Sequence, residues 1–350
     1  MHIGCIFIVF SLKLQRIVSI ILSFTGGSLC GGLTGVSESP ARKGWKGMLR
    51  YSIKRILLAL LTVLIIAAIT FFAMNAIPGG PFSSEKAIDP ATLAALEARY
   101  GLDKPLGEQF VNYLRNLLQG DLGVSLKTGR EISDVIGESF GVSARLGLMA
   151  ALIAVVAGLA LGSIAALCRG KWPDRIIIFI TTLFVSVPSF VLATILLLVF
   201  CLQLRWVGVW STSNPNYILP VISLAMYPMA YITRLTKSSM LDVLGQDYIR
   251  TARAKGVKDS LVIFKHALRN ALIPVITYVG PMTAYILTGS MVVETVFTIG
   301  GLGTQFVKSI NNQDYPMIMA TTIFLAVLMV VATLLSDLVY KLVDPRIKLD

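Results

Sequence analysis

Charged side chains are scarce in this sequence of 350 residues: only 14% are Asp, Glu, Lys or Arg, whereas 55% are hydrophobic. A soluble domain carries roughly 25% charged residues. Too few charges are present to cover a water-soluble globule, so the sequence predicts a protein whose main solvent is lipid. The apolar residues occur in long blocks, which favours a single helical membrane domain.

Cysteine and histidine are scarce as well, with four and two copies. None of Cys5, Cys30, Cys168 and Cys201 belongs to a Cys-x-x-Cys pair. This composition argues against a metal site or a disulfide framework. We expect the cysteines to serve as small apolar core residues.

Acidic residues are outnumbered by basic ones, which gives a net charge of +12. In a soluble protein this excess would suggest a nucleic-acid partner. Here Lys and Arg concentrate in short loops between apolar blocks, as in membrane proteins with a defined orientation. We therefore predict no nucleic-acid partner.

Six apolar blocks approach the roughly 20 residues that a membrane span needs. The predicted spans are Ile56–Ile77, Leu146–Leu167, Ile176–Leu204, Ile218–Leu235, Leu272–Phe297 and Met317–Leu342. The third is long enough to tilt, or to bend at Pro188. Prolines also interrupt the fourth and fifth spans, at Pro220, Pro228, Pro274 and Pro281. Proline frees backbone groups that protein or water must satisfy, so such spans suit a transport pathway, although simple packing kinks would look the same.

Orientation follows from the basic residues, which fall on one side if there are six spans. They cluster before the first span, between the second and third, between the fourth and fifth, and in the tail. The long loop Pro78–Glu138 instead holds six basic and nine acidic residues. We predict a multi-pass protein of a bacterial inner membrane with both termini in the cytoplasm. The segments Pro78–Glu138 and Gln203–Asn216 are then outside, and Lys237–Asn270 is inside.

The outer loop 78–138 is expected to contain two helices. In the first, Asp89 is the cap, Pro90 the first residue and Gly101 the end. Its apolar stripe is Leu93, Leu96 and Tyr100. The second starts near Leu106, stops at Gly120 and carries Phe110, Tyr113, Leu114 and Leu117 on one face.

Residues 1–47 form an N-terminal extension that lacks a good span. Two short apolar stretches resemble a signal peptide, but cleavage there would place the basic segment Arg42–Arg55 outside. We expect Met48 to be the initiator and residues 48–350 to form the membrane domain. The alternative is a seventh hydrophobic element within residues 1–47.

The loop between the fourth and fifth spans, residues 237–270, divides at Gly256. Before it, Asp247 could cap a short helix; after it, Leu261, Phe264, Leu268 and Ala271 would form an apolar stripe, with Lys258, Lys265 and Arg269 facing away. Two short helices joined at a glycine make a compact projection that can transmit force to a partner. A plain interfacial loop that binds anionic headgroups would have the same pattern.

The segment Asp247–Gly256, followed by His266-Ala-Leu-Arg-Asn-Ala, resembles the cytoplasmic coupling loop of binding-protein-dependent ABC importer permeases. It is similar to the oligopeptide, dipeptide and nickel branch, and most to the oligopeptide "B" subunit, since the connection between spans three and four is short. Of the general superfamily pattern it keeps only Ala252, Gly256 and Leu268. Further resemblances are Pro78–Pro81, Gly101–Pro105, Gly120–Gly123, Pro188–Phe190, Gly289–Phe297, Gly301–Gly303, Asp314-Tyr315 and Asp344–Arg346.

The resemblance implies an all-α fold with six transmembrane helices, the type I ABC importer permease fold. It implies a non-catalytic subunit that forms half of a peptide pathway. The implied partners are a homologous second permease, two ATP-binding subunits that hold ATP and Mg, and an extracytoplasmic peptide-binding protein. The chain itself has no phosphate-binding Gly-x-x-x-x-Gly-Lys-Ser/Thr loop and no implied cofactor. The implied coupling residues are Asp247, Tyr248, Arg250, Ala252, Arg253, Gly256 and Leu268.

Other functions stay open on the sequence alone. Dipeptides, glutathione or a nickel chelate could replace oligopeptides, because the branch shares its loop motifs. A proton-coupled secondary transporter would need ionisable residues inside the spans, whose interiors are nearly free of them. Glu294 and Asp337 lie near span ends, and Arg145 precedes the second span. We expect these three to be interfacial or packing residues. A membrane enzyme is disfavoured because His, Asp and Cys do not cluster.

Overall fold

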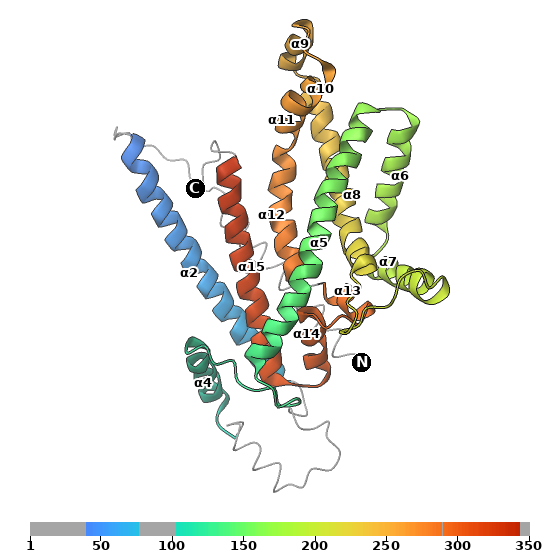
Figure 1. The fold of residues 1–350 in the computed structure, drawn as a ribbon. Helices are drawn as coiled ribbons and strands as arrows, with labels where there is room; N and C mark the ends of the chain where they lie inside the picture. The colour runs from blue at the N-terminus through green and yellow to red at the C-terminus, as the bar shows by residue number, and fades with distance from the viewer. Residues whose placement is uncertain (1–39, 77–102, 289, 344–350) are drawn as a thin grey trace. The chain divides into compact units, whose positions relative to one another are not determined.

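Long apolar helices make up most of the computed structural model, which describes residues 40–76, 103–288 and 290–343 (Figure 1). Within these residues five stretches are long and apolar enough to cross a membrane. They lie in α2 (Pro40–Asn75), α5 (Ile132–Leu167), α8 (Ile218–Leu244), α12 with α13 (Ile273–Leu287, Met291–Val296) and α15 (Tyr315–Val343). Each overlaps a predicted span, and the all-α class is confirmed.

The third predicted span is a sharply bent pair of helices. α6 (Trp172–Ser186) and the following α7 (Ser189–Leu196) with the π-helical η1 (Leu197–Gln203) meet at an angle of 104°. The break falls at Val187, which has an extended backbone, just before Pro188. The ring of proline disfavours the α conformation in the preceding residue, so the helix ends there. Counted as one span, the pair brings the described crossings to six.

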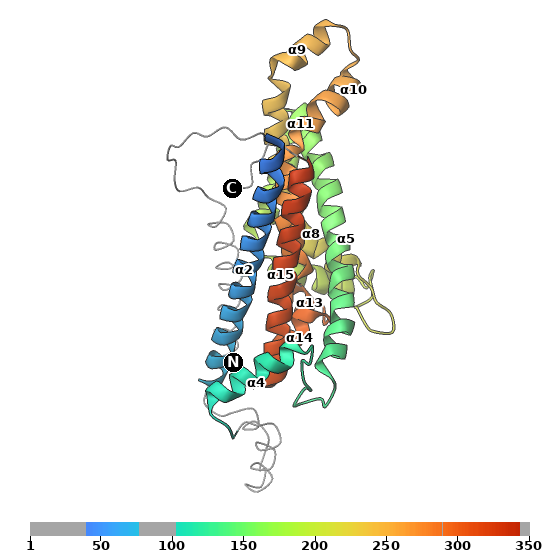
Figure 2. The ribbon, with the colours of Figure 1, turned by 90° about the vertical axis from the view of Figure 1, so that its left-hand side faces the viewer.

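The chain divides into two compact units. The first comprises residues 1–137, 306–330 and 346–350; the second comprises residues 138–305 and 331–345. In the first unit α4 (Leu106–Leu118) lies across the end of α2 (Figure 2). The ring of Phe110 packs on Phe71 and Phe72 at centroid distances of 5.3 and 5.8 Å. The predicted face of Phe110, Tyr113, Leu114 and Leu117 is confirmed, because these four residues are half-buried while most other residues of α4 are exposed.

A buried carboxylate holds the segment after α4 to the start of α15. Asp314 accepts hydrogen bonds from the Ser125 hydroxyl, at 2.5 Å, and from the Leu126 amide, at 3.2 Å. Its backbone carbonyl also accepts from the amide of Ile318 in the first turn of α15. The predicted helix over residues 89–101 lies outside the described residues, as do residues 1–39 of the predicted extension. α2 begins at Pro40, earlier than the predicted span start at Ile56.

In the second unit α6 and α12 both pack against α8 (Figure 1). α5 approaches α8 closely through two glycines one turn apart. A Cβ at Gly158 would lie 2.7 Å from the Ile232 side chain, and one at Gly162 would lie 2.6 Å from the carbonyl oxygen of Thr233. Small residues spaced in this way let helix backbones meet at van der Waals distance, which replaces the hydrophobic driving force absent in lipid. The helices that carry the site are therefore closely packed.

Candidate functional site

The predicted coupling loop projects beyond the ends of α8 and α12 (Figure 1, Figure 2). Its first element is α9 (Asp247–Ala254). The expectation that Asp247 caps this helix is wrong: Gln246 occupies the cap position, and Asp247 is the first helical residue. An acidic residue in the first turn still interacts favourably with the helix dipole. Asp247 also forms an ion pair of 3.5 Å with Arg250, and both side chains are exposed.

Gly256 ends α9 in a left-handed conformation with a φ of +76°. The amide of Gly256 donates to the carbonyl of Arg253, and the amide of Val257 donates to that of Ala252. This pair of bonds is a Schellman motif, in which glycine supplies the positive φ and an apolar residue follows. No atom lies within 4 Å of a Cβ built at Gly256, so the conformation and not crowding calls for glycine.

The segment after Gly256 contains α10 (Asp259–Leu261), the π-helical η2 (Val262–Leu268) and α11 (Arg269–Ala271). The predicted apolar stripe is wrong at Leu261 and Phe264, which are 49% and 70% exposed. The buried residues are Val262, Ala267 and Ala271. A π-helix has more residues per turn than the 3.6 of an α-helix, so the buried face follows a wider spacing. Lys258, Lys265 and Arg269 are exposed, as predicted.

An apolar cluster fixes the loop to the helix ends. It joins Ala166 of α5 and Met240 of α8 to Ile249, Val262 and Ala267 of the loop. Among the predicted coupling residues, Ala252 and Leu268 pack against this cluster and are half-buried. The side-chain amide of Asn270 donates to the hydroxyl of Tyr248 at 2.8 Å, and this bond joins α9 to the segment after η2. The loop is therefore a defined structure that can move together with α8.

The outward surface of the loop is basic with apolar side chains between the charges. Arg250 is highly exposed, and Arg253 is half-exposed and pairs with Asp259 at 3.4 Å. Exposed ion pairs of this kind contribute little to stability, so these charges are free to meet a partner. Within the described residues no three His, Cys, Asp or Glu side chains gather into a metal-binding group. The arrangement supplies a contact surface.

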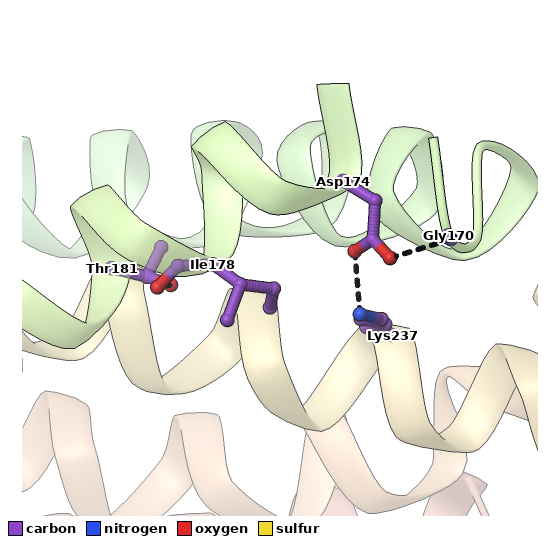
Figure 3. A network of polar contacts seen from close by, with 5 residues as sticks. All are labelled: Gly170, Asp174, Ile178, Thr181 and Lys237. Atoms are coloured by element: carbon purple, nitrogen blue, oxygen red, sulfur yellow. Dashed lines mark hydrogen bonds and ion pairs between the residues drawn. The ribbon is translucent and has the colours of Figure 1, made fainter. Parts of the chain in front are cut away.

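A buried ion pair joins α6 to α8 (Figure 3). Lys237 of α8 donates to Asp174 of α6 at 2.5 Å, and the amide of Gly170 donates to the other carboxylate oxygen at 3.0 Å. Asp174 is almost fully buried, and Lys237 is about one-fifth exposed. The pair therefore fixes α8, which leads directly into the loop, to the neighbouring helix α6.

Glu294 is a packing residue, as expected, and it is completely buried in α13. Its carboxylate accepts from the hydroxyl of Ser143 at 2.7 Å and from the amide of Thr304 at 3.2 Å. The Ser143 oxygen in turn accepts from the amide of Leu302 at 2.8 Å. These contacts satisfy amides at the start of α14 (Leu302–Asn311). Arg145 is exposed on α5, and the side chain of Asp337 is outside the described residues.

The partners of Asp174 and Glu294 were not predictable from the sequence. Asp174 and Lys237 are 63 positions apart, and Ser143 and Glu294 are 151 apart. A usable signal existed only for the helix contacts, because Gly158 and Gly162 form the Gly-x-x-x-Gly pattern typical of close membrane-helix pairs.

Two family models match this chain. The model described as the binding-protein-dependent transport system inner membrane component matches residues 158–349. The model for the N-terminal part of such components matches residues 48–147. Together they cover nearly all of the predicted membrane domain.

Curated relatives match over most of the chain. The dipeptide transport system permease protein DppB of Bacillus subtilis is 47% identical over 86% of this chain and 99% of its own length. The oligopeptide transport system permease protein OppB of Haemophilus influenzae is 43% identical over 86% of this chain and its full length. Among solved structures, the inward-facing MetNI methionine ABC transporter is 16% identical, with a TM-score of 0.49 over 60% of this chain and 96% of that one.

Proposed function

Because the chain belongs to the family of binding-protein-dependent transport system inner membrane components, we propose that it is a permease subunit of an ATP-driven peptide importer. It forms half of the translocation pathway and does not itself catalyse ATP hydrolysis. The relatives named for dipeptides and for oligopeptides align with this chain over almost their whole length, which supports peptides as the substrate class.

The observation that carries the mechanism is the build of residues 247–271. A left-handed glycine joins α9 to the η2 segment, and an apolar cluster anchors both to α5 and α8. A displacement of the exposed surface is therefore passed to α8. In the proposed cycle ATP binding closes two ATPase subunits, their closure moves this loop, and α8 changes the access of the pathway.

The proposed partners are a homologous second permease, two ATP-binding subunits and an extracytoplasmic peptide-binding protein. ATP and Mg belong to the ATP-binding subunits. The basic, exposed surface of Arg250, Arg253 and Lys258 suits acidic groups on an ATPase rim, and the exposed ring of Phe264 suits an apolar recess there. The loop 237–270 and both termini are cytoplasmic in this proposal.

The test is reconstitution of the complete transporter in proteoliposomes with wild type or Gly256→Val. A β-branched residue in the left-handed region is strained by about 1–2 kcal/mol, so the variant should lose the Schellman motif. We expect normal membrane insertion but a several-fold loss of ATP hydrolysis stimulated by the loaded binding protein. ATP hydrolysis and peptide uptake are measured in the same vesicles.

Gly107→Val is the matched control, because Gly107 also has open space around a built Cβ but lacks the positive φ. This control should couple like wild type. Wild-type coupling by Gly256→Val would show that the loop is not the coupling element. Absence of ATP-dependent peptide uptake by the wild-type complex would refute the proposed function.

A further inference from the structure

Two neighbouring spans of the second unit expose tyrosines on adjoining faces. On α8, Tyr227, Tyr231 and Arg234 are exposed at a spacing of four and three residues, which places them on one helix face. On α12, Tyr285 is exposed and Tyr278, two turns before it, is half-buried.

The two helix faces meet through their rings. Tyr231 and Tyr278 stack at a centroid distance of 4.3 Å with an interplanar angle of 33°. Tyr227 lies one turn before Tyr231 on the same face of α8. We refer to Tyr227, Tyr231, Tyr278 and Tyr285 as the tyrosine face.

This face differs from the lipid-type surfaces of the same protein. The most exposed side chains of the α2 span are aliphatic, such as Leu57 and Leu60, at 61% and 62%. Those of α5, such as Leu152 at 66%, are aliphatic too. Exposed phenol hydroxyls within a span are costly in hydrocarbon and are found facing a water-filled cavity or a protein partner.

The backbone of both helices also favours a polar environment at this face. Pro228 follows Tyr227 directly, and Pro281 lies between Tyr278 and Tyr285. Each proline lacks the amide hydrogen that would bond four residues back, so a carbonyl in each helix needs another partner. Within the described residues the structure gives the four tyrosine hydroxyls no hydrogen-bond partner either. Polar groups without a hydrogen-bond partner in the protein are tolerated at membrane depth where water or a polar ligand contacts them.

The chemistry of the face suits a ligand whose backbone is constant and whose side chains vary. A phenol both donates and accepts hydrogen bonds, so it can bond the amides and carbonyls of any peptide. Its ring contacts apolar side chains and attracts cations, including a peptide amino terminus. Arg234, next along α8, offers a charged partner for a carboxyl terminus. A dry subunit interface would instead be depleted of such a charge.

We propose that the tyrosine face is the surface along which an extended peptide contacts this subunit during translocation. The inference rests on the proposed function and adds the residues that touch the substrate. Contacts of this kind are independent of peptide sequence, because they use the backbone, the termini and any apolar side chain.

Photo-crosslinking in the complete, reconstituted transporter tests the contact. The photoreactive p-benzoylphenylalanine replaces Tyr231 or Tyr285, and Phe179 as the control, since Phe179 is an aromatic residue of α6 that is 71% exposed. Tritium-labelled trialanine is presented by the binding protein with ATP. We expect label on the subunit at positions 231 and 285, reduced by excess unlabelled trialanine, and none at position 179.

Uptake rates give a second readout. Tyr231→Phe, which keeps the ring, should lower trialanine uptake about threefold, and the double variant Tyr231→Leu with Tyr285→Leu about tenfold or more. Assembly with the partner subunits, measured by co-purification, should be unchanged. Phe179→Leu should transport like wild type.

The two proposals fail in different ways. If the wild-type complex imports trialanine but positions 231 and 285 capture only the second permease or lipid, the tyrosine face is a subunit or lipid contact and this inference is overturned. Wild-type uptake by the double leucine variant would overturn it too. If the wild-type complex imports no peptide, the proposed function fails and this inference falls with it.

Discussion

Two side chains satisfy the free amides at the start of α14, and two glycines leave room for them. Ser143 accepts from Leu302 and Glu294 accepts from Thr304. A Cβ at Gly301 would lie 2.5 Å from an oxygen of each of these two side chains. At Gly303 a Cβ would lie 2.7 Å from the Cα of Met291. The Gly-Leu-Gly motif is therefore explained by crowding, since neither glycine has a positive φ.

Gly301→Ala should destabilise the protein, because the added methyl group displaces the buried carboxylate or the hydroxyl from its hydrogen bonds. Overpacking of this kind costs about 1–3 kcal/mol. The melting temperature of the purified subunit in detergent should fall by several degrees.

The neighbouring Gly300→Ala is the matched control. A Cβ there would meet only the ring of Trp210, at the ordinary contact distance of 3.8 Å. This variant should melt within about a degree of wild type, because surface-like substitutions without crowding change stability little. Equal melting temperatures for the two alanine variants would refute the crowding argument.

At the scale of helices, the pair of Asp174 and Lys237 joins α6 to α8 (Figure 3). Removing one partner leaves the other charge without its counterion, which costs stability; the partial exposure of Lys237 keeps this cost below the roughly 3–5 kcal/mol of a fully buried pair. Lys237→Met alone should therefore lower the stability of the subunit.

The double variant Asp174→Asn with Lys237→Met should recover much of that loss, since no buried charge remains and methionine fills the volume of the lysine chain. Thermal unfolding of the two single variants and the double variant, as a double-mutant cycle, measures the coupling. Additive losses would mean that the two side chains do not interact in the folded protein.

Helix periodicity predicted some faces correctly and missed others for a physical reason. The half-buried side of α4 follows the 3.6-residue pattern because that helix is regular. The same periodicity predicts an apolar stripe through Leu261 and Phe264, but these side chains are exposed because the π-helical turn of η2 widens the spacing of the buried residues. The bend at Pro188 was predictable because proline restricts the residue before it. The pairing of Ser143 with Glu294 was not, because no local pattern links positions so distant in the sequence.

For the whole molecule, the orientation of the six described crossings in the membrane is a prediction that rests on the positions of Lys and Arg. Lys127→Cys and Lys258→Cys, each in a variant whose four native cysteines are serine, report the two sides. A membrane-impermeant maleimide applied to intact cells should label position 127 and leave position 258 unlabelled.

Permeabilised cells provide the control for that experiment, since both positions should then react. Labelling of position 258 but not 127 in intact cells would reverse the proposed orientation and move the loop 237–270 away from the ATPase subunits.

The π-helical turn η2 makes the connection between the coupling loop and α12 able to lose one residue. A π-turn amounts to one extra residue in an α-helix, and each α-helical residue turns the chain by about 100°. Loss of a single codon between positions 262 and 268 would keep the reading frame and nearly all of the composition. It would turn η2 into a regular α-helix and leave α12 in its present rotation, with Tyr278 still beside Tyr231. Such a one-codon deletion should therefore retain uptake, measured as growth on peptides as the sole amino-acid source, and loss of growth would show that α12 had rotated.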